Sequence, residues 1–450
     1  MSPWYSKLLW LAIFGLPAFA VLFSRALQKP RPRNPRLFPA LLLSTLWTLP
    51  TLLIVQHLNL HFQWWSFKAS GPRFCDMPVD LYLGWVILWG IVPQLVFPGL
   101  GVTEIVILLV AFDLWLMPSL IQTNGDSRWL LGEVFAAAIV LWPSLHLMRA
   151  TLHNRRLSLR VMMQTLLCGL LFLYLLPEMV FALQPQTQHS PAAPSVWQAL
   201  LSTPHWLLQV ALQVLFLLAV PGLTAVQEFA QRGRGTPIPY DPPLRLVTSG
   251  IYRYCANPMQ LSCAVVMLVW AALLHSLWFA AGAVLSIVYS AGLATWDEHT
   301  DLARRFGVRW QLYRIAVPAW RLRWRPYHAG PPARLYISAS CGSCSELRRW
   351  LEARQPLHLD FIDAETLPAG SITRLRYNPI DGTPPEDGLR ALARALEHCN
   401  LAWAYCGFTL RLPVFCQVFQ LLMDACGFGP RTIPSTCPAK TVPDSSPGTS

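Results

Sequence analysis

Charged side chains are scarce in this sequence. They make up 13% of the 450 residues, about half the share that is typical of soluble globular proteins. Acidic residues are the scarcer kind, with 23 Asp and Glu against 35 Lys and Arg, whereas hydrophobic residues make up 54%. This composition excludes an ordinary soluble domain and a disordered chain as descriptions of the whole sequence.

The sequence also lacks a disulfide framework. Its 11 cysteines are odd in number and scattered along the chain, unlike the evenly paired cysteines of small secreted domains. We expect most cysteines on the cytoplasmic side of a membrane to be reduced.

Long apolar runs account for the composition. Each has roughly 18–22 residues, which is enough for a helix to cross the bilayer core. The first run is too long, and too poor in preceding basic residues, for a cleaved signal peptide. We therefore predict an all-α polytopic membrane protein of about nine transmembrane helices, followed by a C-terminal α/β domain. The predicted spans are 7–24, 37–56, 80–99, 102–121, 129–148, 160–183, 206–226, 258–275 and 277–295.

Basic residues indicate how these spans are oriented. Lys and Arg gather in segments 25–36, 149–160, 232–253 and 304–325, which all lie on one side of the membrane if there are nine spans. By the positive-inside rule this side is the cytoplasm, so the N-terminus is outside and the C-terminal domain is cytoplasmic. The predicted localisation is multi-pass integral membrane, the inner membrane if the cell is bacterial. Because the basic residues flank spans, we expect anionic membrane lipids as partners and no nucleic acid.

One acidic residue, Asp113, falls near the middle of the fourth predicted span. A charge at the centre of a membrane costs at least about 2.5 kcal/mol and usually faces the interior of a helix bundle. A hydrogen bond between helices is the favoured interpretation of Asp113, and a contact with a substrate is the alternative.

A polar segment rich in Pro and Gly separates the seventh and eighth predicted spans. It contains Gly250, Tyr252 and Arg253 and leads into Asn257-Pro258, and after the ninth span come Asp297-Glu298-His299, Phe306-Gly307, Tyr313-Arg314 and Val317-Pro318. A short link near residue 275 makes spans eight and nine an antiparallel hairpin, so we expect their polar ends to meet at the cytoplasmic surface. An Arg beside carboxylates suits a zwitterionic ligand, because Arg binds a carboxylate through two hydrogen bonds.

The order of these residues resembles the C-terminal half of the isoprenylcysteine carboxyl methyltransferase family, over residues 206–325. The resemblance implies a membrane methyltransferase that uses S-adenosylmethionine on a lipophilic substrate, such as a prenylated cysteine carboxylate or a lipid amine. It implies that Arg253 and Asp297 or Glu298 hold the amino acid end of the cofactor. The full implied cofactor site is Tyr252, Arg253, Asn257, Asp297, Glu298, His299, Tyr313 and Arg314.

Two positions depart from that family's pattern, which has Arg where Ala256 stands and Tyr where Gln260 stands. Ordinary structural explanations also exist for single parts of the motif. Asn257-Pro258 is a favourable start for any helix, and Tyr252 with Arg253 could anchor the chain at the membrane interface.

Residues 329–433 have the pattern of a small soluble domain. Strands are predicted at 334–338, 359–363 and 375–377, and helices at 345–354 and 386–398, from alternating and helical periodicity. With Cys341-Gly-Ser-Cys344 between the first strand and the first helix, this order resembles the thioredoxin-like DCC family of thiol-disulfide oxidoreductases. That family usually has Asp-Gly where Ser338-Ala339 stands here.

Two cysteines separated by two residues suit redox chemistry when they lie at the start of a helix. The helix N-terminus lowers the pKa of the first thiol, so Cys341 is the predicted attacking thiolate and Cys344 the resolving thiol. A partner protein that carries a thiol is then expected. Two alternatives stay open: zinc bound with Cys399 and Cys406, and a domain that keeps the fold without redox activity.

The sequence thus predicts an N-terminal transmembrane bundle (1–205), a methyltransferase-like membrane core (206–328), a thioredoxin-like DCC-type domain (329–433) and a disordered tail (434–450). The expected function is methylation of a lipophilic membrane substrate with S-adenosylmethionine, without a metal, beside a cytoplasmic thiol-disulfide redox module. The alternatives are a membrane-anchored thiol-disulfide oxidoreductase whose spans are a degenerate anchor, and a non-catalytic membrane binding protein.

Overall fold

The computed structural model describes residues 15–27, 34–68, 72–122, 127–183, 195–238, 242–368 and 370–431, but not the side chains at 16, 18, 24–27 and 293–300. The chain folds into two compact units, the first made of residues 1–208, 236–242 and 270–279, and the second of 209–235, 243–269 and 280–450. The first predicted span lies partly, and the predicted tail at 434–450 wholly, outside the described residues.

Among the described residues, six helical segments are long and apolar enough to cross a membrane. They correspond to predicted spans two to seven, so the chain has the helices expected of an integral membrane protein. The segments are α3 (Leu37–Phe62), α4 (Val79–Gly90) with α5 (Val92–Val96), α6 (Val102–Leu120), α7 (Trp129–Ala136) with η2 (Ala137–Leu141) and α8 (Trp142–Leu152), α9 (Leu157–Leu170) with η3 (Leu171–Leu175) and α10 (Leu176–Leu183), and α12 (His205–Gln231).

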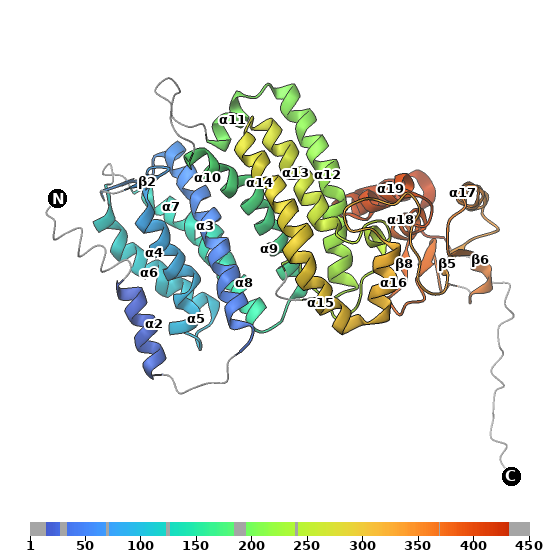
Figure 1. Ribbon diagram of the computed structural model, residues 1–450, viewed down its shortest axis with the longest axis horizontal. Coiled ribbons are helices and arrows are strands. Elements are labelled where there is room, and N and C mark those ends of the chain that lie inside the picture. The colour runs from blue at the N-terminus through green and yellow to red at the C-terminus, as the bar shows by residue number, and fades with distance from the viewer. Residues whose placement is uncertain are drawn as a thin grey trace, which may run out of the picture. The chain divides into compact units, whose positions relative to one another are not determined.

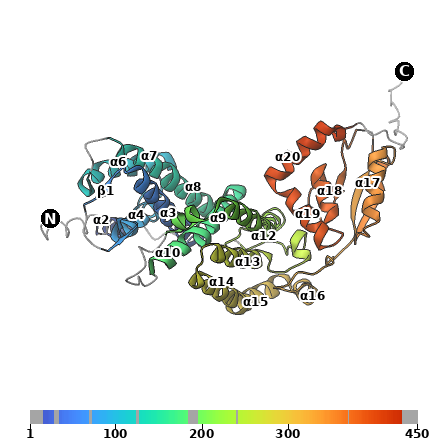
Figure 2. The same ribbon diagram turned by 90° about the horizontal axis from the view of Figure 1, so that it is seen from above.

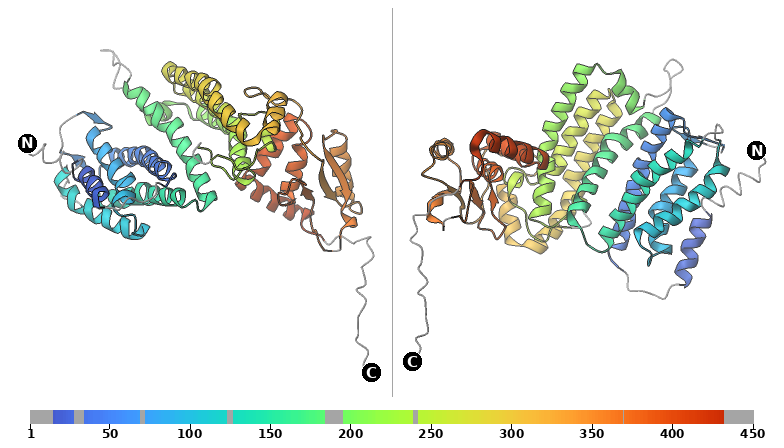
Figure 3. Two further views of the ribbon diagram at one scale, coloured as in Figure 1. Left: turned by 60° about the horizontal axis from the view of Figure 1, so that its bottom comes forward. Right: turned by 180° about the vertical axis from the view of Figure 1, so that it is seen from behind.

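The eighth and ninth predicted spans correspond to shorter apolar segments, α13 (Pro258–Leu273) and Leu277–Gly292. The second of these belongs to one continuous helix, in which α14 (Leu277–Tyr289) passes through η5 (Ser290–Ala294) into α15 (Thr295–Phe306). Figures 1 and 3 show this helix running alongside α13 and α12. The total of nine spans stays a prediction.

Helix α3 is the centre of the first unit, where it packs against α4 and α8 (Figure 1). Asp113 of the neighbouring α6 is fully buried. The indole groups of Trp85 and Trp89, both on α4, donate hydrogen bonds to its two carboxylate oxygens at 3.3 and 2.9 Å. The favoured interpretation of Asp113, a hydrogen bond between helices, is confirmed.

The described chain before the C-terminal part also contains several short strands and helices. In the first unit, β1 (Ser66–Phe67) pairs with β4 (Ile121–Gln122), and β2 (Arg73–Phe74) pairs with β3 (Met77–Pro78). The remaining helices are α2 (Leu16–Leu27), α11 (Val196–Ser202), η4 (Gly250–Arg253) and α16 (Val308–Ala316).

The C-terminal part contains a four-stranded sheet with the order β6-β5-β7-β8. Strand β5 (Ala333–Ile337) pairs in parallel with β6 (Leu359–Asp363) and antiparallel with β7 (Arg376–Asn378), which pairs antiparallel with β8 (Glu386–Asp387). The three predicted strands lie within one residue of β5, β6 and β7. Strand β8 takes the place of the first residues of the predicted helix at 386–398.

Helices cover one face of this sheet. Ala333, Leu335 and Ile337 of β5 are buried while Arg334 between them is exposed, because successive side chains of a strand point to opposite faces. The buried side forms a core with α17 (Gly342–Glu352) and α18 (Leu389–Leu396). Figure 2 shows α17 apart from a group formed by α18, α19 (Leu401–Arg411) and α20 (Pro413–Met423). The last described helix, η7 (Asp424–Phe428), follows α20.

Candidate functional site

The two cysteines of the Cys341-Gly-Ser-Cys344 motif lie where β5 passes into α17. Cys341 is the residue that caps α17, and Cys344 lies in the first turn of that helix. Both thiols are free and partly exposed. The amide groups at a helix N-terminus favour a negative charge, so this position favours a thiolate.

The contacts of the two thiols make them chemically unequal. Hydrogen bonds from Cys344 and then from Ser343, whose Oγ lies 3.2 Å from Sγ of Cys341, lower the pKa of Cys341 to about 7. Arg431 adds a donor, with Nη1 at 3.7 Å from the same sulfur. Burial, together with the hydrogen bond to Cys341, raises the pKa of Cys344 to about 12. Near neutral pH Cys341 is therefore partly ionised to the thiolate, whereas Cys344 is protonated.

The loop that leads to Cys341 is held by Glu365, which lies in η6 (Ala364–Thr366). Its carboxylate accepts hydrogen bonds from the hydroxyls of Ser338 and Ser340, at 2.7 and 2.8 Å, and from the backbone N–H groups of Ala339 and Ser340. Burial alone would raise the pKa of Glu365, but these donors lower it to about 2. The Ser338-Ala339 pair thus has a definite role in fixing the approach to the thiols.

A pocket of about 530 Å³ opens beside the two thiols. This volume is within the range of sites for small ligands. Most of its wall comes from apolar side chains of the sheet, α17, α18 and the helices after them: Ile337, Leu347, Leu375, Leu389, Leu392, Met423 and Phe428. Arg374, Gln420 and Arg431 supply polar groups at the same pocket.

Several of these residues could not be connected with the thiols from the sequence. Arg431 lies ninety residues after Cys341, and no local pattern links the two. Arg348, which is close to Cys341 in sequence, pairs instead with Glu352 and Asp363 at 2.9 and 2.5 Å.

The zinc alternative for the cysteine pair finds no support in the geometry. Cys399 is buried and Cys406 exposed. In the described part of the chain, the one group of three or more side chains placed to share a metal ion is His57, Cys75 and Glu178.

The residues predicted to bind S-adenosylmethionine come from two segments that lie side by side. The hydroxyl of Tyr313, on α16, donates to the carbonyl of Tyr252 in η4 at 2.8 Å. The backbone N–H groups of Ala256 and Asn257 donate to the carbonyls of Pro318 and Ala319 at 2.9 and 3.2 Å. The structure therefore places the segment from Tyr252 to Asn257 beside the segment that carries Tyr313 and Arg314, although about sixty residues separate them.

Arg253 has one buried guanidinium nitrogen, Nη1, without a hydrogen-bond partner among the described residues. Its neighbour His328 stacks with His358 and His398 at ring distances of 4.9 and 4.7 Å. Burial, with the charge of Arg253 and with His358, lowers the pKa of His328 to about 2. The His328 ring is thus a neutral polar neighbour of the arginine.

The other predicted cofactor residues have different surroundings. The guanidinium of Arg314 lies over the ring of Trp310 at 5.7 Å, and Tyr252 and Tyr313 are buried in packing. Asp297, Glu298 and His299 lie on α15, but their side chains fall outside the described residues.

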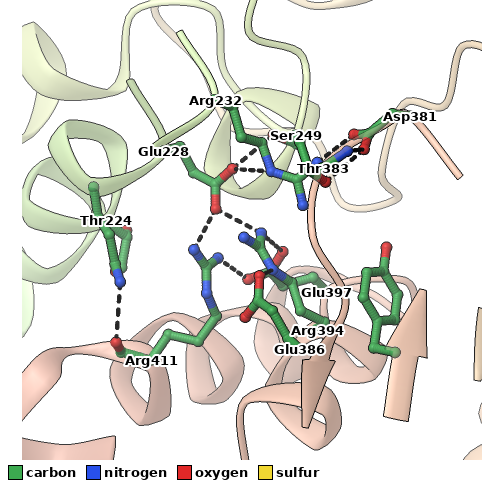
Figure 4. A network of polar contacts seen from close by, with 12 residues as sticks. Thr224, Glu228, Arg232, Ser249, Asp381, Thr383, Glu386, Arg394, Glu397 and Arg411 are labelled. Atoms are coloured by element: carbon green, nitrogen blue, oxygen red, sulfur yellow. Dashed lines mark hydrogen bonds and ion pairs between the residues drawn. The ribbon is translucent and has the colours of Figure 1, made fainter. Parts of the chain in front are cut away.

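Sequence analysis missed a buried ionic network next to the Ser249-Gly250 turn. Glu228 of α12 is fully buried, and its Oε1 accepts hydrogen bonds from Arg394 (at 2.5 Å) and Arg411. Its Oε2 accepts from Ser249 at 2.6 Å and faces Arg232 at 3.1 Å. Figure 4 shows both arginines converging on this carboxylate.

The same arginines have further carboxylate partners. Arg411 also pairs with Glu397, and Arg394 pairs with Glu397 at 3.2 Å and Glu386 at 2.8 Å. Burial alone would lower the pKa of Arg394, but these carboxylates, Glu228 first, raise it well above its usual value. The network joins α12 to α18 and α19, so it connects an apolar helix to the C-terminal domain (Figure 4).

Comparison with family models, curated proteins and solved structures finds no match for this chain.

Proposed function

We propose that this chain is a membrane-anchored thiol-disulfide oxidoreductase whose reactive pair is Cys341 and Cys344. The observation that carries the proposal is the inequality of the two thiols at the start of α17, with pKa values of about 7 and about 12. The sheet order β6-β5-β7-β8 supports a thioredoxin-like domain, because the cysteine pair follows its central parallel strand directly.

The reaction needs only these two thiols and a substrate disulfide. The Cys341 thiolate attacks one sulfur of the substrate, which breaks the disulfide and releases the other sulfur as a thiolate. Cys344 then loses its proton and attacks Cys341, forming the Cys341–Cys344 disulfide and releasing the second substrate thiolate. Two electrons pass from the pair to the substrate, and a thiol reductant of the cytoplasm, where we place the domain, restores the pair.

The surroundings of the pair favour a lipophilic substrate. The pocket beside Cys341 has mostly apolar walls, so it suits a disulfide that adjoins an apolar group. Helix α20, whose residue Gln420 lines this pocket, also exposes apolar side chains: Val414, Val418, Phe419, Leu421 and Leu422. Its Phe415 stacks on Phe216 of the apolar helix α12 at 5.3 Å, which supports access from the membrane surface.

The first prediction concerns the rate at which the thiols are alkylated. We expect Cys341 to react with iodoacetamide much faster than Cys344 near neutral pH, because the thiolate is the reacting species. The rate at Cys341 should rise through a midpoint near pH 7 and then level off, following its lowered pKa. Mass spectrometry of differentially labelled peptides between pH 5.5 and about 9 measures both rates.

Two variants sharpen this measurement. Ser343→Ala removes the contact at 3.2 Å, and Arg431→Gln removes the charge at 3.7 Å, so either change should move the midpoint to higher pH. The exposed Cys426 reports the rate of an ordinary accessible thiol in the same sample. Slow labelling of Cys341 without pH dependence would count against a reactive thiol.

A methyltransferase that uses S-adenosylmethionine is the second candidate function. It is favoured by the pairing of segments 250–257 and 313–319 and by the buried Nη1 of Arg253, which has no hydrogen-bond partner among the described residues. Buried donors of this kind usually have a partner, and a ligand carboxylate would supply one. The molecule that receives the methyl group would be a lipophilic molecule of the membrane, such as a prenylated cysteine carboxylate.

The matching prediction is that the purified protein in detergent binds S-adenosylmethionine or S-adenosylhomocysteine, measured by calorimetry. Arg253→Ala should weaken binding by roughly 10–150-fold, since an unpaired ligand carboxylate costs about 1.5–3 kcal/mol. Arg309→Ala, an exposed arginine on α16, is the control and should bind as the parent does. Absence of binding by the parent would remove this candidate and leave the thiol function untouched.

A further inference from the structure

A separate cluster of reactive side chains lies in the first unit. His57 of α3, Cys75 of the β2–β3 turn and Glu178 of α10 place one ligand atom each within 4.8 Å of one another. Both Sγ of Cys75 and Oε1 of Glu178 lie 3.8 Å from Nε2 of His57. Ligand atoms around a tetrahedral zinc ion lie about 3.3–3.8 Å apart, because zinc–ligand distances are about 2.0–2.3 Å. Small side-chain movements would therefore close the three atoms around one ion.

We propose that His57, Cys75 and Glu178 bind a single zinc ion. Imidazole, thiolate and carboxylate are all zinc ligands, and a mixed set of this kind suits zinc better than magnesium or calcium, which prefer oxygen. Three protein ligands leave a fourth position for water or an external ligand. This site goes beyond the thiol-disulfide function and does not depend on it.

The hydrogen bonds of His57 involve Nδ1 and leave Nε2, the nitrogen nearest Cys75 and Glu178, available to bind a metal. Its Nδ1 lies 3.1 Å from the carbonyl of Leu53, which can only accept a hydrogen bond, and 2.7 Å from the hydroxyl of Tyr174. In the tautomer in which Nδ1 donates to this carbonyl, the lone pair of Nε2 faces Cys75 and Glu178. Metal-binding histidines usually donate their other N–H to a carbonyl in this way.

The turn that carries Cys75 is held in an uncommon conformation. Cys75 and Asp76 have φ angles of 49° and 61°, values that favour Asn or Gly at the centre of a two-residue hairpin turn. Gln56 donates to the carbonyl of Cys75 at 2.9 Å, and Tyr82 donates to the carbonyl of Phe74 at 3.3 Å. These bonds hold Cys75 beside α3. Because Gln56 and His57 are adjacent residues of α3, the Cys75 thiol is also held near His57.

Glu178 supplies a buried carboxyl group to the cluster. Its side chain is 3% exposed and accepts a hydrogen bond from the N–H of Val196 at 2.9 Å. Among the ion pairs of the described residues, its only partner is His57, and no Lys or Arg faces it. A zinc ion would neutralise this carboxylate together with the Cys75 thiolate.

The test uses the full-length protein in detergent, stripped of metal with a chelator and titrated with Co²⁺ and then Zn²⁺. We expect one Co²⁺ per chain and a sulfur-to-cobalt charge-transfer band in the near ultraviolet, which Zn²⁺ abolishes by displacement. Cys75→Ser should remove that band, and both Cys75→Ser and Glu178→Gln should weaken Zn²⁺ binding at least about 100-fold. His61→Gln, one turn along α3 and exposed, is the matched control and should bind as the parent does.

A second measurement needs no substitution at the site. In the parent protein, Zn²⁺ should protect Cys75 from alkylation, whereas the labelling of Cys426 should stay unchanged. Failure of the folded parent to bind Co²⁺ or Zn²⁺ stoichiometrically would overturn the proposal, as would an unaltered cobalt spectrum in Cys75→Ser. In that case the three side chains form only a hydrogen-bonded cluster.

Discussion

Cys341→Ser is expected to abolish disulfide reduction by this protein. A serine hydroxyl does not ionise near neutral pH and cannot form the mixed disulfide, so turnover should fall at least about 1,000-fold. The measurement is the release of a coloured thiolate from an aromatic disulfide by the purified protein, with a thiol reductant present and the uncatalysed rate subtracted.

Cys344→Ser should give a different result from Cys341→Ser. Attack by Cys341 can still occur, but the mixed disulfide has no resolving thiol, so it should accumulate and be visible by mass spectrometry of the intact protein. Cys426→Ser is the control, because Cys426 is an exposed cysteine of η7. Parent-like turnover by Cys341→Ser would refute the proposed function, whatever the outcome at the zinc site.

Glu228→Gln is expected to weaken the attachment of the C-terminal domain to α12. The change keeps the size of the side chain but removes one of the two carboxylates that Arg394 and Arg411 share, so that Glu397 alone remains common to both, inside a site where both are 2% exposed. Removing one partner from a buried ionic network costs about 3–5 kcal/mol. Amides of α18 and α19 should therefore exchange with solvent roughly 100- to 5,000-fold faster, as measured by hydrogen–deuterium exchange.

The control for this experiment is Glu352→Gln, which removes a more exposed partner of Arg348 on α17. Ion pairs of that kind contribute about 0–1 kcal/mol, so exchange in α18 and α19 should stay close to that of the parent. Unchanged exchange in Glu228→Gln would show that apolar contacts such as Phe216 with Phe415 hold the domain without the network.

The apolar runs and the short strands were predictable because each depends on a local pattern. A run such as Leu37–Phe62 must be a helix if it crosses a bilayer, since its backbone groups can then bond only to each other. Strand β5 lies within one residue of its predicted position, because its side chains alternate between buried and more exposed along consecutive residues. The boundary between β8 and α18 was harder to predict, since the pairing of Glu386 with Tyr377 depends on another strand.

The cysteine motif was also visible in the sequence, but its chemistry was not complete there. A strand, two cysteines and a helix place Cys341 at a helix start, which predicts a lowered pKa. The contact with Arg431, the anchoring of Ser338 by Glu365 and the walls of the pocket come from residues far along the chain. No spacing rule joins such residues, because contacts between distant segments follow from packing.

By itself, the sequence determined the apolar helices, the order β5, α17, β6 and β7 in the C-terminal domain, and the position of Cys341 and Cys344 at a helix start. Local periodicity and helix-end electrostatics are enough for each of these. Only the tertiary structure decided that Glu228 meets two arginines more than 160 residues away, and that His57, Cys75 and Glu178 form one cluster. The physical reason is that a buried charge is stable only with partners around it, and packing of the whole chain chooses those partners.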